Sequence, residues 1–527
     1  MSRPSPLLPL LTAAFLSALS ANASAQAIGL SQLDVGNFTA DEVTNGSPFY
    51  GATLLVADQR MLVSTPAIDQ RVGSVVTPDV GGARILECND EGEWTTVGVL
   101  SPAGLLANSN AGGSCAFSGE RAVLGAPFSD TFGINRGAVV VFDRAADGSW
   151  NQSALIAPPF PGSSDRFGMA VALDGDRLVI GADGVGRAFV YERDAQGAWN
   201  VVAELMPAFP NSEPFFGALV ELNGDRAWVE STGTVFAFSR VGVDWNLSAQ
   251  VTTSGADRLL YDPTNETLIV GLPTESPLGA VDVHVQTSPT TWALAQRITV
   301  NSYEDGFGRS LAIRGDRLIV GAGTGTSDAT IRRAFVFERE PGGPWTKTLD
   351  LHGDAFTNSG VFGSSVALTE NSAHVGVPAG STFSPNGAVA TYDLGTLRHS
   401  GRHLSTVEGR DQRLFLRSGA EHAWHWFVIA GSASGIGAGT ALPGSSLLLP
   451  LTLDAYSLAI LDGSATNLTF WNGPLDANGN ANVDFRVPPL EYVPFIGSVL
   501  HHAYFVIDPV TFAIDHVSNP VPLELVP

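Results

Sequence analysis

Acidic triplets recur between apolar runs of the sequence, and carboxylates are the side chains that most often bind calcium. They read DGD at 174–176, NGD at 223–225 and RGD at 314–316. Calcium takes six to eight oxygen ligands, so a protein loop must be long enough to wrap the ion. A turn made of one such triplet is too short to wrap an ion. The longer DPTNE at 262–266 lacks the spacing of calcium ligands. We therefore interpret them as turns, which also accounts for the RGD sequence, and expect no cofactor and no bound metal here.

A second group of oxygen-bearing side chains lies near the C-terminus, at Asp476, Asn478, Asn480 and Asp484. Their spacing is compatible with calcium, which is the alternative to our preferred interpretation of residues 475–485 as a β-hairpin. That interpretation rests on the Asn-Gly pair at 478–479, the commonest two-residue hairpin turn. A calcium ion at these residues remains the competing hypothesis.

Histidines come in pairs at 422 and 425 and at 501 and 502. Residues separated by an odd number of positions on a strand point to opposite faces, so we expect neither pair to converge on one ion. His422 could still meet His502 across strands, but zinc requires three or four convergent ligands. We predict structural histidines and no metal site.

The chain has two cysteines, Cys88 and Cys115, and this leaves open either a disulfide or a buried free thiol at Cys115. The sequence contains no G-x-S-x-G, H-E-x-x-H or C-x-x-C motif. No pair of carboxylates can be placed at catalytic distance from the sequence alone. We therefore nominate no catalytic, cofactor-binding or metal-binding residue.

These residues lie within a repeated unit. "FGMAVALDGDRLVIGA" at 167–182 returns as "FGRSLAIRGDRLIVGA" at 307–322. The second half of the unit occurs seven times, 41 to 61 residues apart, at 60–66, 121–127, 177–183, 226–232, 267–273, 317–323 and 372–378. Two copies of the first half have lost the aromatic-Gly pair, and we call them worn copies: "AGGSCAF" at 111–117 and "DRLLY" at 257–261. Such a period is typical of propellers and solenoids.

Each unit contains short runs of β-branched and aromatic residues between turn residues, and six units end in a run that begins with Trp. This pattern predicts a four-stranded antiparallel meander. The second run, as in "RLVIGA", is apolar at consecutive positions, so both faces of its sheet must be covered. We predict a seven-bladed β-propeller over residues 26–398, in which Gly allows close approach near the axis and Trp fills the gap between blades. The seventh unit lacks a Trp run, and we expect residues 27–37 to supply its fourth strand.

The aromatic-Gly start and the "GAP"-like end of the second run resemble FG-GAP repeats, the propeller units of integrin α-subunits. The sequence pattern "FGxxVALDGDRLVIGA" is more similar to the calcium-free FG-GAP repeats of secreted bacterial proteins. The resemblance covers roughly residues 27–395 and implies a propeller fold. Integrin-type repeats carry a D-x-D/N-x-D-G-x-x-D calcium loop, which the turns here lack. Propellers host many activities, so the resemblance alone does not give a function.

A different pattern begins near residue 400. Short apolar runs, among them "LLLPLTLD", "YSLAIL" and "AYFVIDPV", alternate with Pro and Gly. They predict a C-terminal β-sandwich over 402–527. This part resembles, more loosely, the all-β modules that end many secreted bacterial repeat proteins.

The N-terminal segment and the net charge limit the functions that are compatible with the sequence. Residues 1–25 have the layout of a signal peptide, with an apolar stretch and small residues before Gln26. The net charge is −24, which disfavours binding to nucleic acid or to an anionic membrane surface. We expect a secreted, non-enzymatic scaffold for binding or adhesion at a cell surface, with a protein or glycan ligand and no membrane insertion. The alternatives are an extracellular hydrolase or lyase with acidic residues in the propeller channel and a purely structural envelope component.

Overall fold

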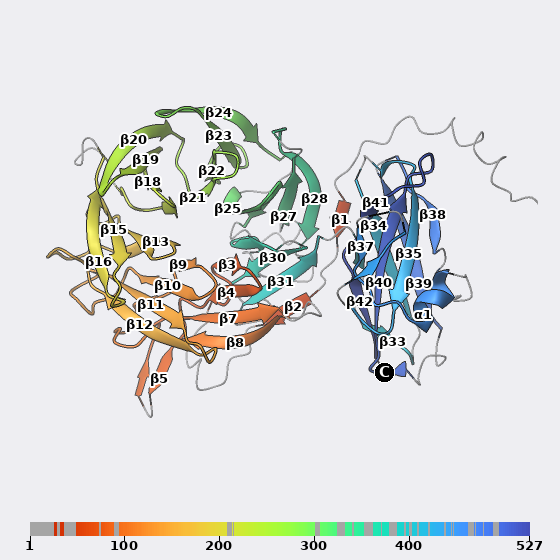
Figure 1. Cartoon of the computed structure of the whole chain (residues 1–527). Coiled ribbons are helices and arrows are strands. Elements are labelled where there is room, and N and C mark those ends of the chain that lie inside the picture. The colour runs from red at the N-terminus through yellow and green to blue at the C-terminus, as the bar shows by residue number, and fades with distance from the viewer. Residues whose placement is uncertain are drawn as a thin grey trace, which may run out of the picture.

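The computed structural model describes residues 26–28, 32–35, 49–72, 75–88, 94–207, 213, 215–300, 306–323, 333–339, 342–352, 362–369, 371–378, 387–394, 397–399, 403–407, 410–419, 422–436, 439–443, 445, 447–461, 468, 471–477, 479–488 and 495–526. The segment expected to be a signal peptide, 1–25, lies outside them. The all-β fold expected from the sequence is confirmed in the form of many four-stranded antiparallel sheets, consistent with a β-propeller. Figure 1 shows these sheets arranged around a ring.

Each repeat forms one sheet, numbered here in chain order. Sheet 1 contains β3 (Leu54–Ala57), β4 (Arg60–Ser64), β7 (Ala83–Cys88) and β8 (Trp94–Leu100), and the hairpin β5 (Gln70–Val72) and β6 (Val75–Thr77) lies between β4 and β7. Sheet 2 contains β9 (Ser114–Phe117), β10 (Arg121–Ala126), β11 (Ala138–Arg144) and β12 (Trp150–Ile156). Sheet 3 contains β13 (Phe167–Asp174), β14 (Arg177–Ala182), β15 (Arg187–Arg193) and β16 (Trp199–Leu205).

The later repeats follow the same order. Sheet 4 contains β17 (Val220–Asn223), β18 (Arg226–Ser231), β19 (Thr234–Val241) and β20 (Asp244–Thr252), and sheet 5 contains β21 (Arg258–Asp262), β22 (Thr267–Leu272), β23 (Ala280–Ser288) and β24 (Thr291–Ile298). Sheet 6 contains β25 (Phe307–Arg314), β26 (Arg317–Ala322), β27 (Arg333–Glu338) and β28 (Thr346–His352), and sheet 7 contains β29 (Val366–Leu368), β30 (Ser372–Val377) and β31 (Ala388–Asp393).

The described residues of the N-terminal segment, 26–28 and 32–35, divide between two sheets. β2 (Gln32–Val35) lies antiparallel to β31 and gives sheet 7 its fourth strand. β1 (Gln26–Ile28), in contrast, pairs in parallel with β28 and adds a fifth strand to sheet 6, which the sequence pattern did not suggest. Sheet 7 also contacts sheet 1 directly, because Ser365 Oγ donates to the Gly51 carbonyl at 2.7 Å. The first and last sheets of the ring are therefore neighbours.

Glycine sets the spacing between sheets. A Cβ added to Gly181 in β14 would lie 2.0 Å from the carbonyl oxygen of Gly217, the Gly of the next repeat's aromatic-Gly pair. The same approach recurs, at 2.0 to 2.2 Å, between Gly125 and Gly168, Gly271 and Gly308, Gly321 and Gly363, and Gly376 and Gly51. The partner glycine has a positive φ, as at Gly217 (+96°). The expected close approach of glycine backbones is thus confirmed.

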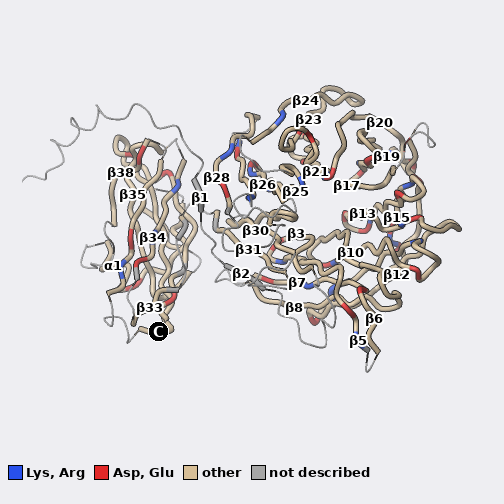
Figure 2. Tube along the Cα trace, turned by 180° about the vertical axis from the view of Figure 1, so that it is seen from behind, with Lys and Arg blue, Asp and Glu red and all other residues tan. Residues whose placement is uncertain are grey.

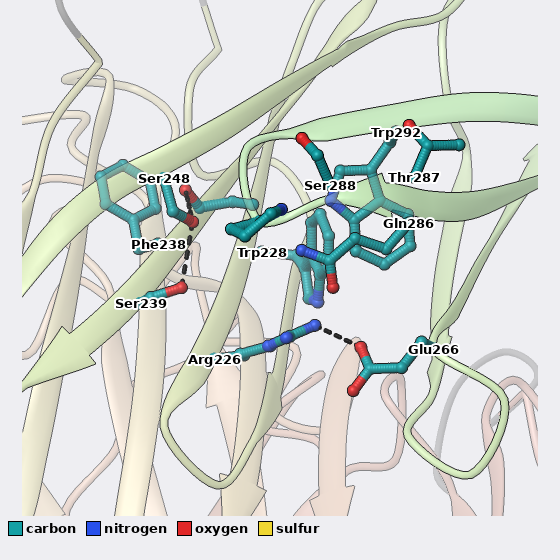
Figure 3. Close-up of a pocket in the computed structure, with 12 residues that line it drawn as sticks. Arg226, Trp228, Phe238, Ser239, Ser248, Glu266, Gln286, Thr287, Ser288 and Trp292 are labelled. Carbon is teal, nitrogen blue, oxygen red and sulfur yellow. Dashed lines mark hydrogen bonds and ion pairs between the residues drawn. The ribbon is translucent and has the colours of Figure 1, made fainter.

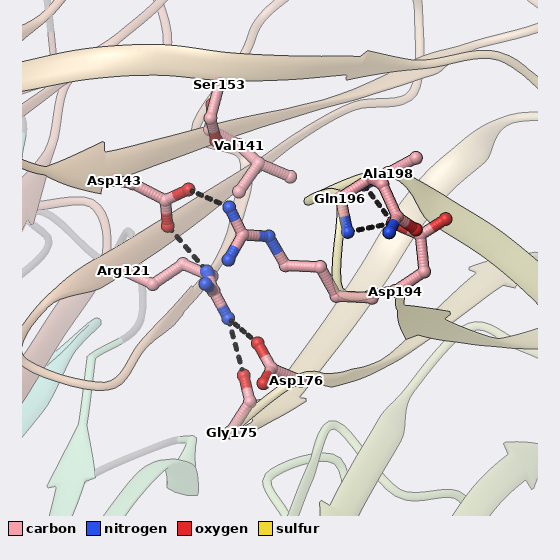
Figure 4. A network of polar contacts seen from close by, with 10 residues as sticks. Arg121, Val141, Asp143, Ser153, Gly175, Asp176, Asp194, Gln196 and Ala198 are labelled. Atoms are coloured by element: carbon pink, nitrogen blue, oxygen red, sulfur yellow. Dashed lines mark hydrogen bonds and ion pairs between the residues drawn. The ribbon is translucent and has the colours of Figure 1, made fainter.

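In sheets 1 to 4, an arginine at the start of the second strand links the sheet to the next one. Arg121 Nε contacts Asp143 Oδ1 of its own sheet at 2.6 Å, and its Nη1 donates to the Gly175 carbonyl and to Asp176 Oδ1 in the next sheet at 2.8 and 2.9 Å (Figure 4). The guanidinium also lies 5.4 Å from the ring centroid of Trp199. Arg177 repeats this arrangement with Asp225 and Trp245. We call this arrangement the arginine latch.

The latch gives a stability prediction. Arg121→Ala should lower the free energy of unfolding by about 2 kcal/mol, because it removes three charge-assisted hydrogen bonds and the contact of the guanidinium with the Trp199 ring. The control is Arg413→Ala, whose partner is Asp484 in the C-terminal unit and whose side chain is 55% exposed. That change should cost about 0–1 kcal/mol. Urea denaturation measures both, and equal losses would contradict the latch.

The C-terminal unit consists of two sheets around one apolar core, which includes Leu414, Phe485 and Tyr504. One sheet has the order β32 (Leu397–His399), β34 (Arg410–Arg417), β39 (Asn480–Val487). The other has the order β33 (His403–Ser405), β42 (Val521–Val526), β40 (Val499–Ile507), β35 (Trp426–Ser432), β38 (Asn472–Pro474), with β41 (Ile514–Val517) paired to β40. β36 (Thr440–Ala441) and β37 (Leu448–Leu449) form a short ribbon. Because β32 belongs to this unit, the unit begins a few residues before the expected start at 402.

Two local expectations for this unit are wrong. "YSLAIL" lies in helix α1 (Ala455–Leu461) and not in a strand. Asp454 caps this helix, because the Ser457 backbone N–H donates to Asp454 Oδ1 and the Ser457 hydroxyl accepts from the Asp454 N–H, each at 3.0 Å. Residues 475–485 do turn at Gly479, but the two sides enter different sheets, since β38 pairs with β35 and β39 with β34. They therefore do not form a hairpin.

Candidate binding site on the loop face of the ring

The meander topology gives the ring two faces. The connections between first and second strands and between third and fourth strands lie at one end of each sheet, here called the hairpin face. The connections between second and third strands, and from a fourth strand to the next sheet, lie at the other end, here called the loop face. The DGD, NGD and RGD turns are on the hairpin face. Pairing of Asp174 with Arg177 and of Arg314 with Arg317 makes them two-residue turns, as expected.

The exposed aromatic side chains of the described ring residues all lie on the loop face. Within the described ring residues, those that are aromatic and exposed are Phe49, Phe128 and Phe215, at 43%, 41% and 54%. Leu106, Ile134 and Val185 are exposed on the same set of connections. Exposed apolar residues elsewhere on the ring are aliphatic, such as Val243 in the β19–β20 turn. Because aromatic residues are enriched at interfaces, their restriction to one face makes the loop face the candidate interaction surface.

The backbone holds two of these side chains in a strained conformation. Phe49 and Phe215 have φ of +53° and +63°, a region that bulky residues rarely adopt. Both directly precede the aromatic-Gly pair of their repeat, and Arg166 has a φ of +54° at the same position of sheet 3. Asn110 has a φ of +52° at the same position of sheet 2, so the positive φ recurs in the repeat and fixes the direction of these side chains. The Arg166 guanidinium lies 5.9 Å from the ring centroid of Phe215.

Charged groups lie beside Phe215. Arg166 Nη2 contacts Asp183 Oδ2 at 3.0 Å, whereas the buried Asp183 Oδ1 has no donor among the described residues. Burial raises the pKa of Asp183, and the charge of Arg166 only partly opposes this. Glu230, at the end of β18, is also buried, and burial raises its pKa to about 7. The Gly233 N–H lowers that pKa, and the nearby carboxylates of Asp257 and Asp183 raise it further.

Glu230 occupies a position that is glycine in repeats 2, 3, 5, 6 and 7 and serine (Ser64) in repeat 1. The Gly217 N–H donates to the Glu230 carbonyl as the Gly112 N–H donates to that of Gly125, so Glu230 corresponds to Gly125. A side chain fits there because the next repeat begins with the worn "DRLLY" and has no aromatic-Gly pair to approach. Sequence reasoning missed this residue. The signal was available, since "RAWVES" departs from "RLVIGA" directly before the worn copy.

The structure also places the residues that the sequence singled out. Cys88 and Cys115 are free thiols, which decides between the two alternatives. Burial raises the pKa of the Cys115 thiol well above its ordinary value, although the charge of Arg258 opposes this. Of the possible calcium ligands, Asp484 contacts Arg413 at 2.7 Å and Asp476 Oδ1 accepts from the Asn480 N–H, while Asn478 lies outside the described residues.

The histidine expectation needs correction. His422 and His425 lie in a turn before β35 and on the same side, with ring centroids 5.6 Å apart. Both face Asp515, at 3.7 and 3.0 Å. His502 is buried and hydrogen-bonds the Tyr456 hydroxyl at 2.8 Å, and burial lowers its pKa to about 3. In the described part of the chain, no group of three or more His, Cys, Asp or Glu side chains is arranged to hold a metal ion.

The distribution of charged residues and the apolar character of the helices bear on possible partners. Acidic residues are spread over both the ring and the C-terminal unit (Figure 2). Among the described residues, no helix has both the length and the apolar character needed to cross a membrane.

Comparison with known proteins supports the repeat assignment. Residues 150–197 match the FG-GAP repeat family, and no curated protein matches the chain. Among solved structures, the periplasmic gluconolactonase of Pseudomonas aeruginosa is 16% identical with a TM-score of 0.40 over 57% of this chain and 85% of its own. A "putative 6-phosphogluconolactonase" from Bacteroides fragilis is 13% identical with a TM-score of 0.41 over 58% and 85%. The chain therefore contains an FG-GAP repeat, within a fold rich in four-stranded antiparallel sheets.

Proposed function

We propose that this chain is an exported binding scaffold: a seven-bladed propeller that presents its loop face to a macromolecular partner, followed by a C-terminal β-sandwich. Export rests on the layout of residues 1–25, and the blade count rests on the repeats and on the contact between sheets 7 and 1. The observation that carries the binding role is the group of exposed phenylalanines on the loop face, two of them on strained backbone.

The composition of this face indicates the chemistry of the partner. Phe215 offers an apolar ring beside Arg166, and Asp183, the partner of Arg166, has a buried carboxylate oxygen without a donor among the described residues. A surface with apolar and basic side chains would complement both features. Of the two ligand classes expected from the sequence, protein and glycan, this combination favours a protein on the loop face.

Site-specific photo-crosslinking tests this function. Phe215 and Val243 are each replaced by benzoylphenylalanine, and the protein is illuminated on cells of the organism that produces it. Val243 is the control because it is apolar and 76% exposed, but lies on the hairpin face. We expect a discrete protein adduct from position 215 only. Identical adducts from both positions, or none from 215, would count against the proposal.

Once a partner is identified by crosslinking, its affinity gives a quantitative prediction. Phe215→Ala should weaken the affinity at least about 10-fold, because a central aromatic anchor commonly contributes more than about 1.4 kcal/mol. Val243→Ala should leave Kd unchanged. Surface plasmon resonance with the purified partner measures both variants.

A second candidate function is an extracellular hydrolase. The specific observation that favours it is the pair Asp183 and Glu230, whose pKa values are both raised, because a carboxyl group with a pKa near 7 can act as a general acid. Chromogenic glycosides and esters test this directly. Turnover that is lost in Glu230→Gln would favour the hydrolase, and no turnover in the unaltered protein would exclude these substrates.

A further inference from the structure

A pocket lies between sheets 4 and 5 at the hairpin-face end, at the opposite end of the sheets from the loop-face phenylalanines. Its volume is about 460 Å³, within the range of about 300–1,000 Å³ usual for small-molecule sites. Figure 3 shows Arg226, Trp228, Glu266, Gln286 and Trp292 around it. The lining comes from β18, β19 and β20 of sheet 4 and from the β23–β24 hairpin of sheet 5, with Glu266 from the β21–β22 turn.

Two indole rings form the apolar wall. The ring centroids of Trp228 and Trp292 are 4.9 Å apart, and the rings are nearly perpendicular at 83°. Trp228 is buried, and its Nε1 has no acceptor in the described part of the structure. Trp292 is only half-buried and borders the pocket. Its ring is therefore the surface on which a ligand can stack.

This pocket exists because the arginine latch differs here. Arg121 and Arg177 cover the rings of Trp199 and Trp245, each of which lies at the start of the next sheet's fourth strand. Arg226 instead lies 5.8 Å from the ring centroid of Tyr261, so that it does not cover Trp292 in the equivalent position. The β21–β22 turn is also longer, with four residues between Asp262 and Thr267.

The polar side of the pocket is electrically neutral. Arg226 Nη1 contacts Glu266 Oε2 at 2.5 Å and the Tyr261 hydroxyl at 2.9 Å. Burial raises the pKa of Tyr261 to about 12, so the hydroxyl stays uncharged at neutral pH. The positive and negative groups thus neutralise each other. Gln286 and the hydroxyls of Thr287 and Ser288 add neutral donors and acceptors.

We infer that this pocket is a saccharide-binding site for a neutral pyranose unit. An apolar sugar face would stack on Trp292, and the hydroxyls would bond to Gln286 and Arg226. Stacking suits a sugar because its ring carbons form an apolar face while its hydroxyls need partners, and the pocket offers both surfaces. The internal Arg226–Glu266 pair leaves no net charge to select an acidic or basic ligand. This inference does not depend on the loop-face proposal.

Calorimetry with four neutral trisaccharides (maltotriose, cellotriose, mannotriose and N,N′,N″-triacetylchitotriose) tests the inference. At least one should bind the unaltered protein with a Kd below about 10 mM. Trp292→Ala should weaken that binding at least 10-fold. The matched control is Trp245→Ala, which removes the equivalent residue of sheet 4 without touching the pocket. It should keep the affinity even if both variants lose some stability.

Gln286→Ala gives a second readout that does not require removal of a packed aromatic ring. Gln286 is half-buried at the pocket edge, and its loss should weaken binding about three-fold or more. The inference is overturned if none of the four trisaccharides binds, if Trp245→Ala weakens binding as much as Trp292→Ala, or if trigalacturonate binds in preference to all neutral probes. Because Trp292 is remote from the loop face, Trp292→Ala should leave the adduct at position 215 unchanged, which separates the two proposals.

Discussion

Gly181→Ala is expected to be among the most destabilising single substitutions in the ring, with a loss of at least about 3 kcal/mol in the free energy of unfolding. The new Cβ would lie 2.0 Å from the Gly217 carbonyl oxygen and 3.2 Å from its Cα, and both are backbone atoms. No side chain can move aside to relieve this contact, so sheets 3 and 4 must separate. Urea denaturation, followed by far-ultraviolet circular dichroism, measures the change.

Gly113→Ala provides the matched control. Gly113 also lies in a repeat, at the start of sheet 2, but it is exposed and a Cβ there would meet only the Asn110 carbonyl at 3.4 Å. Alanine at this position should change stability by less than about 1 kcal/mol, because it creates no backbone clash. Equal denaturation midpoints for the two variants would show that the sheets are not held at this spacing.

The pH dependence of stability should change in Glu230→Gln. The pKa of Glu230 is about 7 in the folded protein, above its ordinary value of 4.5, so the folded state binds this proton more tightly than the unfolded state does. The contribution of Glu230 to the free energy of unfolding is therefore fully present below about pH 4.5 and is lost as the pH rises to about 7. The glutamine variant cannot ionise. It should match the original protein near pH 4.5 and be more stable above pH 7, by about 2–3 kcal/mol.

Thermal unfolding between pH 4.5 and 8.5 measures this effect, with Asp244→Asn as the control because Asp244 is exposed on the hairpin face. Glu221 on β17 adds to the same trend, since burial raises its pKa to about 8. If the stability of Glu230→Gln and of the original protein changes with pH in the same way across this range, Glu230 is ionised throughout. That result would also remove the reason for treating it as a general acid.

Much of the ring could be predicted from local sequence. Each "RLVIGA"-like run is a second strand because it is apolar at consecutive positions, and β14 and β26 are buried accordingly. Glycine in the aromatic-Gly pair predicts close backbone approach, which Gly217 confirms. Trp94 packs between sheets 1 and 7 as the gap-filling hypothesis requires. These features follow from steric and solvation rules that act within one repeat.

The C-terminal unit was harder to predict because its segments have no repeat to compare with. "YSLAIL" is short and apolar, and so fits a strand or a buried helical turn equally well until Asp454 is seen to cap it. The period-2 rule placed His422 and His425 on opposite faces, but it does not apply to the turn in which they lie. Only the observed backbone brings both toward Asp515.

The sequence by itself therefore determined the repeat, its strands and the glycines that let sheets approach, because each depends on residues close together in the chain. Only the tertiary structure showed what surrounds the residues that depart from the repeat pattern. Glu230 is buried because sheet 5 starts with a worn copy, and Trp292 is left uncovered because Arg226 turns to Tyr261. Both sites are made by two sheets at once. Their chemistry depends on distances across the interface between sheets, which no single repeat encodes.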